Sequence, residues 1–84
     1  MKNIKKMKEH KLNDFYQAVL LKSVGFPLVR LERDDSRYVV FVFDDPEEKV
    51  NDTINDYWNR NIQVDARTLI ENINELKTRI HTKI

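Results

Sequence analysis

The chain has 84 residues, a net charge of +1 and no cysteine. This length allows one small domain and excludes a second, and the lack of cysteine excludes disulfides and thiolate metal sites and favours an intracellular compartment. No apolar stretch is long enough for a signal peptide or a membrane span, so the sequence predicts a cytoplasmic protein without membrane contact.

Charge is distributed unevenly along the chain. Residues 1–11 carry five lysines and one glutamate, and we predict that they form a flexible lysine-rich leader ahead of a single domain at 12–84. From Asp44 to Asp56 the balance reverses, with six carboxylates and one lysine. Two fields of opposite sign can steer a partner, but they are also typical of solvated surfaces.

The first predicted element is a helix over about Asp14–Val24. Asn13 is a candidate N-cap, and Gly25 provides the stop. Apolar residues occupy more than one stripe of this helix, which predicts that it is covered on more than one side.

Two strands follow, in "FPLVRLER" and "RYVVFVFDD", joined by a three- to five-residue loop around Asp34 to Ser36. Alternation predicts that the second strand is apolar on both faces. One face carries Val39, Phe41 and Phe43, and the other carries Tyr38, Val40 and Val42.

The second of these faces needs a cover, because a lone two-stranded hairpin is marginal in water. Three candidates are a helix on that side, a short extra strand around Lys8 to Leu12, and a second copy of the chain. The last candidate predicts a homodimer with Tyr38, Val40 and Val42 at its interface.

Two helices complete the chain. Asp45 before Pro46 predicts the start of a helix that extends to about Asn59. Tyr57 and Trp58 follow the apolar positions of this helix at helical spacing, which predicts that they lie in the core; if exposed, they would be anchors for a partner. After a short "RNIQV" connection, Asp65 is the predicted N-cap of a strongly amphipathic third helix.

The predicted fold is therefore a small α+β domain of order α-β-β-α-α, with a β-hairpin packed against helices. The stretches "GFPL", "VVFVFDD", "DYWN", "VDARTL" and "LKTRI" resemble a family of small prokaryotic and phage-borne domains of unknown function, over roughly Leu12 to Ile80. The resemblance implies a compact accessory protein and supplies no catalytic residues.

The sequence predicts no enzyme, no cofactor and no metal site. A single glycine excludes a Gly-rich phosphate loop, and neither His10 nor His81 has a nucleophile or second ligand at a suitable spacing. Glu47-Glu48-Lys49 matches part of a magnesium nuclease pattern, but it follows a helix-starting proline, whereas that pattern belongs on a strand.

Two functions are open. The first is protein association, with a homodimer as one form. The second is nucleic-acid binding, through phosphate contacts from the leader and the hairpin. The residues predicted for the second function are Lys2, Lys5, Lys6, Lys8, Lys11, Arg30, Arg33 and Arg37.

Overall fold

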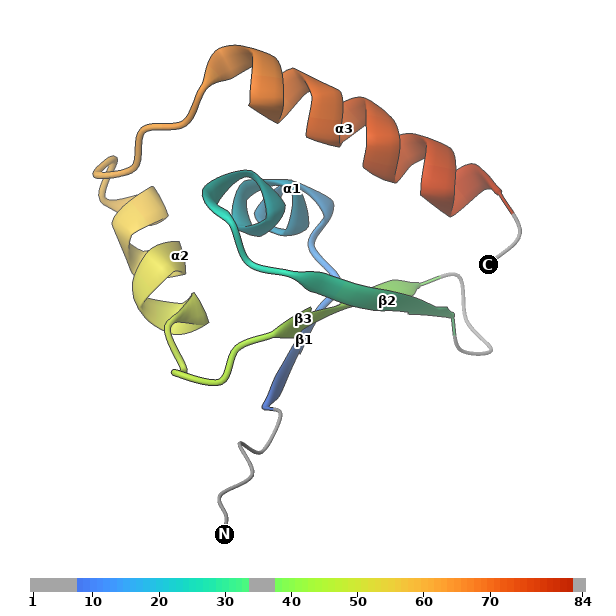
Figure 1. Ribbon diagram of the computed structural model, residues 1–84, viewed down its shortest axis with the longest axis horizontal. Helices are drawn as coiled ribbons and strands as arrows, with labels where there is room; N and C mark the ends of the chain where they lie inside the picture. Colours follow the sequence, from blue (N-terminus) through green and yellow to red (C-terminus); the bar gives the residue numbers. More distant parts are fainter. Residues whose placement is uncertain (1–7, 34–37, 83–84) are drawn as a thin grey trace, which may run out of the picture.

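The structure is a computed structural model that describes residues 8–33 and 38–82. The predicted α+β class is confirmed, and one strand precedes the predicted order of elements. In chain order, the elements are β1 (Glu9–Leu12), α1 (Phe15–Val24), β2 (Leu28–Arg33), β3 (Val39–Asp44), α2 (Val50–Trp58) and α3 (Ala66–His81). Figure 1 shows that α1 lies between the sheet and α3, while α2 stands at one end of the sheet.

The three strands form one antiparallel sheet in the order β1-β3-β2. The predicted hairpin is its β2–β3 pair, and β1 adds to the other side of β3, with Glu9 opposite Asp44 and Leu12 opposite Phe41. This is the extra strand that was one of three candidates, although it lies beside β3 in the sheet and not over its face. It includes residues 9–11 of the predicted leader.

Residues that pair directly across an antiparallel sheet point to the same face. We call the side toward the helices the inner sheet face; its apolar side chains join the core with α1, Val50 and Leu76. The opposite side is the outer sheet face. The register places seven residues on the outer face: Glu9, Lys11, Arg30, Glu32, Val40, Val42 and Asp44.

α1 has clear ends, but the N-cap is Asp14 and not the predicted Asn13. The Asp14 carboxylate accepts a hydrogen bond from the Gln17 amide at 3.0 Å, which satisfies one of the free amides of the first turn. Gly25 follows the last turn with φ of 112°. Four consecutive residues of α1 are buried, as expected for a helix covered on more than one side: Ala18, Val19, Leu20 and Leu21.

α2 begins at Val50, four residues later than predicted. Glu48 has a φ of 57°, which lies outside the right-handed helical region, so residues 46–49 are not part of the helix. The Glu48 amide donates to the Asp45 carbonyl at 3.0 Å, which closes a turn ahead of α2. Asp45 still satisfies the first amides of the helix: its buried carboxylate accepts hydrogen bonds from the Lys49 amide at 2.7 Å and from the Val50 amide at 3.1 Å. The predicted capping role of Asp45 is therefore confirmed, across a longer turn.

α3 begins at its predicted cap. The Asp65 carboxylate accepts a hydrogen bond from the Thr68 amide at 2.9 Å, and this bond lowers the pKa of Asp65. One turn after another, α3 packs on α1: Leu76 is fully buried, and the Asn72 amide donates to the Ser23 hydroxyl at 3.0 Å.

Candidate protein-binding groove

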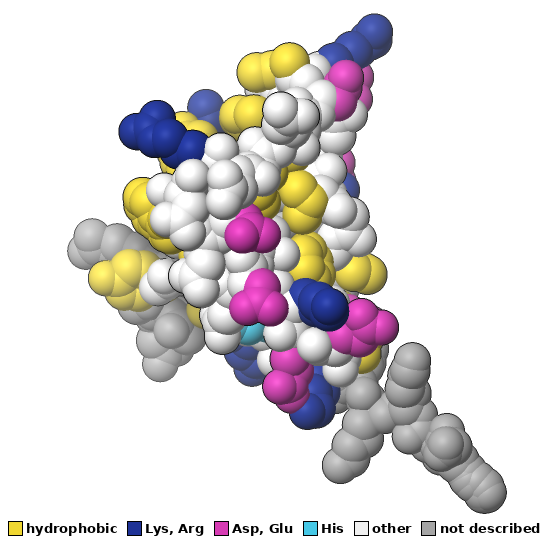
Figure 2. Space-filling view, turned by 90° about the vertical axis from the view of Figure 1, so that its left-hand side faces the viewer, with side chains coloured by type: hydrophobic (Ala, Val, Ile, Leu, Met, Phe, Trp, Pro, Cys, Tyr) yellow, Lys and Arg dark blue, Asp and Glu magenta, His cyan; other side chains and the backbone are white. Residues whose placement is uncertain are grey.

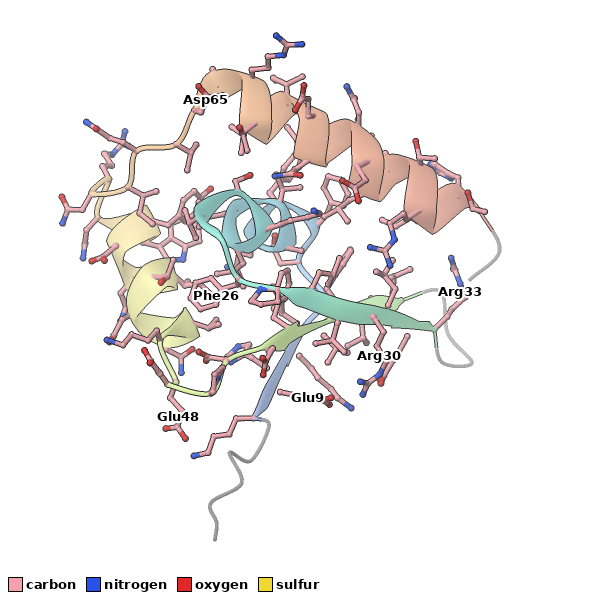
Figure 3. The ribbon with its side chains drawn as sticks, in the orientation of Figure 1. Glu9, Phe26, Arg30, Arg33, Glu48 and Asp65 are labelled. Atoms are coloured by element: carbon pink, nitrogen blue, oxygen red, sulfur yellow. The ribbon has the colours of Figure 1, made fainter. Side chains whose placement is uncertain are left out.

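The outer sheet face is covered by charged side chains. Arg30 of β2 donates to both carboxylate oxygens of Glu9 on β1, at 2.8 and 3.0 Å, and the Lys11 ammonium of β1 lies 3.4 Å from Glu32 of β2. Both pairs cross the central strand β3, where Val42 is 0% exposed. Figure 3 shows Glu9 and Arg30 together on the side of the sheet away from the helices. The chain's own charged side chains therefore close this face.

Arg30 lowers the pKa values of the two glutamates that it contacts on this face. Its hydrogen bonds are the largest cause of the lowered pKa values of Glu9 and Glu32, whose ordinary value is 4.5, and the charge of Lys11 lowers both further. A carboxylate whose pKa is lower in the folded state than in the unfolded state contributes its full stabilisation at pH values above the unfolded-state pKa. This stabilisation is lost as the pH falls through the folded-state pKa.

Arg30→Gln is therefore expected to destabilise the domain in a pH-dependent way. The difference in free energy of unfolding between wild type and variant should be largest at neutral pH and should shrink as the pH falls below 4.5, the ordinary carboxyl value. Urea unfolding across a pH series measures it. The control is Arg67→Gln, which removes an exposed i,i+4 pair with Glu71 and should follow the wild-type profile. A difference that is constant with pH would contradict the role of Arg30.

The described cations predicted to bind nucleic acid already have oxygen partners. Lys8 pairs with Glu48, and Arg33 donates to the Ile80 carbonyl of α3 at 2.9 Å; Figure 3 shows Arg33 near the C-terminal end of α3. Lys11 and Arg30 belong to the pairs on the outer sheet face. Four members lie outside the described residues: Lys2, Lys5, Lys6 and Arg37.

The three residues predicted as a dimer interface do not form one exposed patch. Tyr38 is 62% exposed and Val40 is partly buried, but Val42 has no exposed surface. A partner at this face would meet mainly the charged pairs that cross β3.

A different surface is apolar. A groove of about 420 Å³ lies between α1, the end of α2, the 59–65 connection and α3, and we call it the aromatic groove. Its volume is in the range of binding pockets, roughly 300–1,000 Å³. Figure 2 looks onto the α2 side and shows apolar side chains reaching the surface in the middle and upper part of that face. The groove is lined by Tyr16, Val19, Leu20, Tyr57, Arg60, Ile62, Val64, Leu69 and Ile73.

The prediction that Tyr57 and Trp58 lie in the core is wrong. Tyr57 is 39% exposed and Trp58 is 66% exposed, and their rings pack edge to face with centroids 5.1 Å apart. In α2 the buried residue is Val50, in the first turn, so the core closes at the other end of the helix. The last turn extends beyond the core and presents both aromatic rings at the surface beside the groove.

The chain leaves α2 through a left-handed residue that is not glycine. Arg60 has a φ of 62°; its amide donates to the Tyr57 carbonyl at 3.0 Å, and the Asn61 amide donates to the Asp56 carbonyl at 2.8 Å. These two bonds form a Schellman motif. After α1 the corresponding left-handed position is occupied by Gly25, which has no side chain. A residue with a side chain, such as Arg60, pays about 1 kcal/mol to adopt this conformation.

A second hollow, of about 430 Å³, opens beside the start of α2 and includes Asp44 and Asp45 in its lining. One oxygen of Asp44 is buried without a hydrogen-bond partner, and both oxygens of Asp45 are hydrogen-bonded to amides at the start of α2. Because the Asp45 carboxylate is already used by the helix, we assign this hollow to the turn that begins α2. The aromatic groove is the stronger candidate site, because exposed aromatic side chains border it.

Comparison with known families assigns the chain to one family. The profile of a domain of unknown function, DUF5659, matches residues 7–82. The chain belongs to the DUF5659 family. No curated protein and no solved structure shows a significant match. The expected resemblance to a family of unknown function is thus confirmed, and the matched range begins ahead of β1, so β1 is part of the DUF5659 domain.

The described residues of this DUF5659 domain include no cluster of three His, Asp or Glu side chains placed to hold a metal ion. Across residues 8–33 and 38–82, its helices are too short or too polar to cross a membrane.

The aromatic groove of the DUF5659 domain was missed from the sequence because three of its nine lining residues come from the 59–65 connection. Ile62 and Val64 alternate with polar residues between α2 and α3, and both are partly buried. The sequence did contain a signal for the groove: apolar residues alternate in a loop that directly follows two aromatic residues. Pairing that loop with Tyr16 required knowledge of how the helices pack.

Proposed function

We propose that this DUF5659 domain is a non-enzymatic module that binds another protein through the aromatic groove. The observation that carries the proposal is the exposure of Tyr57 and Trp58 beside an apolar groove, in a domain whose core closes without them. Trp, Tyr and Arg are the residues that most often dominate interface energies. Tyr16, 60% exposed, adds a third aromatic side chain to the rim.

Nucleic-acid binding has less support from the same structure. Lys8, Lys11 and Arg30 each lie beside a carboxylate, and a phosphate approaching them would meet these carboxylates as well. Salt-dependent phosphate binding requires cations that can release counterions. A mixed-sequence DNA duplex therefore serves as the comparison probe in the test below.

The test is a selection of twelve-residue peptides displayed on phage against the purified wild-type domain, followed by affinity measurements with synthetic copies of the selected peptides. Trp58→Ala and Tyr57→Ala are each expected to weaken binding by at least about tenfold, because exposed anchors at an interface lose energy of this size on truncation. Circular dichroism should show an unchanged fold for Trp58→Ala, since this side chain is mostly exposed.

Tyr38→Ala is the matched control, because Tyr38 is nearly as exposed as Trp58 but lies on the hairpin. Peptides that bind all three variants and the wild type equally would sink the proposal. Light scattering tests the second-copy form: a mass near twice 10.1 kDa that Trp58→Ala returns to the single value would make another copy the partner. Mass gained with the duplex alone would favour the nucleic-acid function.

A further inference from the structure

We propose that Arg60 is a specificity residue of the aromatic groove and that the groove takes a partner segment which combines apolar side chains with a carboxylate. The inference rests on the proposed function and names the chemistry of the partner. Its basis is the position of one exposed cation in an otherwise uncharged lining.

The lining explains why a carboxylate is the complementary group. Among the nine described residues that line the groove, Arg60 alone carries a charge. Across residues 8–33 and 38–82 its guanidinium forms no hydrogen bond or ion pair, as is also true of Arg79 outside the groove, whereas Arg30, Arg33 and Arg67 are all paired. A free guanidinium at an apolar rim can hold a carboxylate by two parallel hydrogen bonds, and the low local polarity strengthens them.

The backbone gives a second and independent observation. Arg60 occupies the left-handed position of a Schellman motif, with φ of 62°, although glycine is favoured there. A second Schellman motif, after α1, has Gly25 at the same position. Since non-glycine residues in such conformations collect at functional sites, the strained position points to a role for the side chain.

A structural explanation for Arg60 makes the opposite prediction. A cation near the C-terminus of a helix interacts favourably with the helix dipole, so a purely structural Arg60 would destabilise the domain when it is replaced. If the Arg60 side chain instead contributes little to the fold, as a binding role allows, Arg60→Gly should stabilise the domain, because glycine relieves the positive φ. We expect the midpoint of thermal unfolding to rise by about 4–8 °C, the shift that relief of about 1 kcal/mol of strain gives a domain of this size.

The binding test uses fluorescein-labelled twelve-residue peptides that share one apolar sequence and carry Glu, Gln or Lys at the same flanking position. By fluorescence polarisation, the wild-type domain should bind the Glu form about tenfold more tightly than the Gln form, with the Lys form weakest. Arg60→Gln should remove the preference for Glu, and the preference should weaken at high salt. Arg67→Gln, which alters another exposed arginine, should keep it.

Each outcome has a distinct meaning. A Glu preference that Arg60→Gln removes and Arg67→Gln keeps supports the inference. Equal binding of all three forms, still weakened by Trp58→Ala, overturns the role of Arg60 and leaves protein binding at the groove intact. Loss of stability in Arg60→Gly, together with unchanged peptide preference in Arg60→Gln, overturns the inference in favour of a structural role. Peptide binding that neither Arg60→Gln nor Trp58→Ala affects contradicts both proposals.

Discussion

Val42→Lys is expected to lower the free energy of unfolding by about 3–5 kcal/mol, the usual cost of an unpaired buried charge. Val42 is 0% exposed and stands in the central strand, opposite Lys11 on one side and Arg30 on the other. A new ammonium group would lie between two cations and would break the pairs that cross β3. A domain of this length has a total stability of roughly 4–12 kcal/mol, so chemical denaturation should show a variant that is barely folded or unfolded.

Val40→Lys is the matched control. It lies on the same strand and the same face, but its neighbour in the sheet is Glu32 and its side chain is partly exposed. A lysine there has a carboxylate opposite it, so we expect a change within about 1 kcal/mol, as for ordinary surface substitutions. Equal losses in the two variants would show that the ion pairs do not cover Val42 as described.

Asp45→Ala is expected to cost about 2–4 kcal/mol, because it removes two charge-assisted hydrogen bonds at once. Asp45 is 5% exposed, and its carboxylate accepts from the amides of Lys49 and Val50. The amide of Val50, a fully buried residue, would lose its partner. We expect a lower midpoint in urea unfolding and a loss of helical signal that reports on α2.

The comparison for Asp45→Ala is Asp14→Ala. Asp14 is an ordinary N-cap that accepts from one exposed amide, that of Gln17, so its loss should cost about 1 kcal/mol. Similar costs at the two positions would contradict the view that Asp45 is the main support of the turn before α2.

The sequence allowed the fold class to be predicted because its local signals agree with the tertiary structure. Gly25 ended α1 as expected, Asp65 capped α3, and alternation located both strands of the hairpin. β1 was harder to predict as a certain strand, because "EHKL" is short and mostly polar and pairs only with a strand some thirty residues away. Non-local pairing leaves little local trace.

The candidate site was harder to predict than the fold. Periodicity placed Tyr57 and Trp58 in the core, because they follow Val50 and Ile54 at helical spacing. In α2, however, Val50 and Ile54 make the core contacts, and the last turn of the helix lies beyond the core. The left-handed Glu48 that delays the helix has no sequence signal, since glutamate rarely adopts this conformation. The ion pairs on the outer sheet face also depend on the strand order, which sequence reasoning did not supply.

That strand order also affects how the protein is made. β3 is central in the described sheet, yet the ribosome delivers it after both β1 and β2. Because each strand pair includes β3, the two edge strands have nothing to pair with until Asp44 has emerged. The sheet therefore cannot form until about half of the chain has been made, and a nascent chain that stalls before β3 lacks the whole sheet and not merely one strand of it.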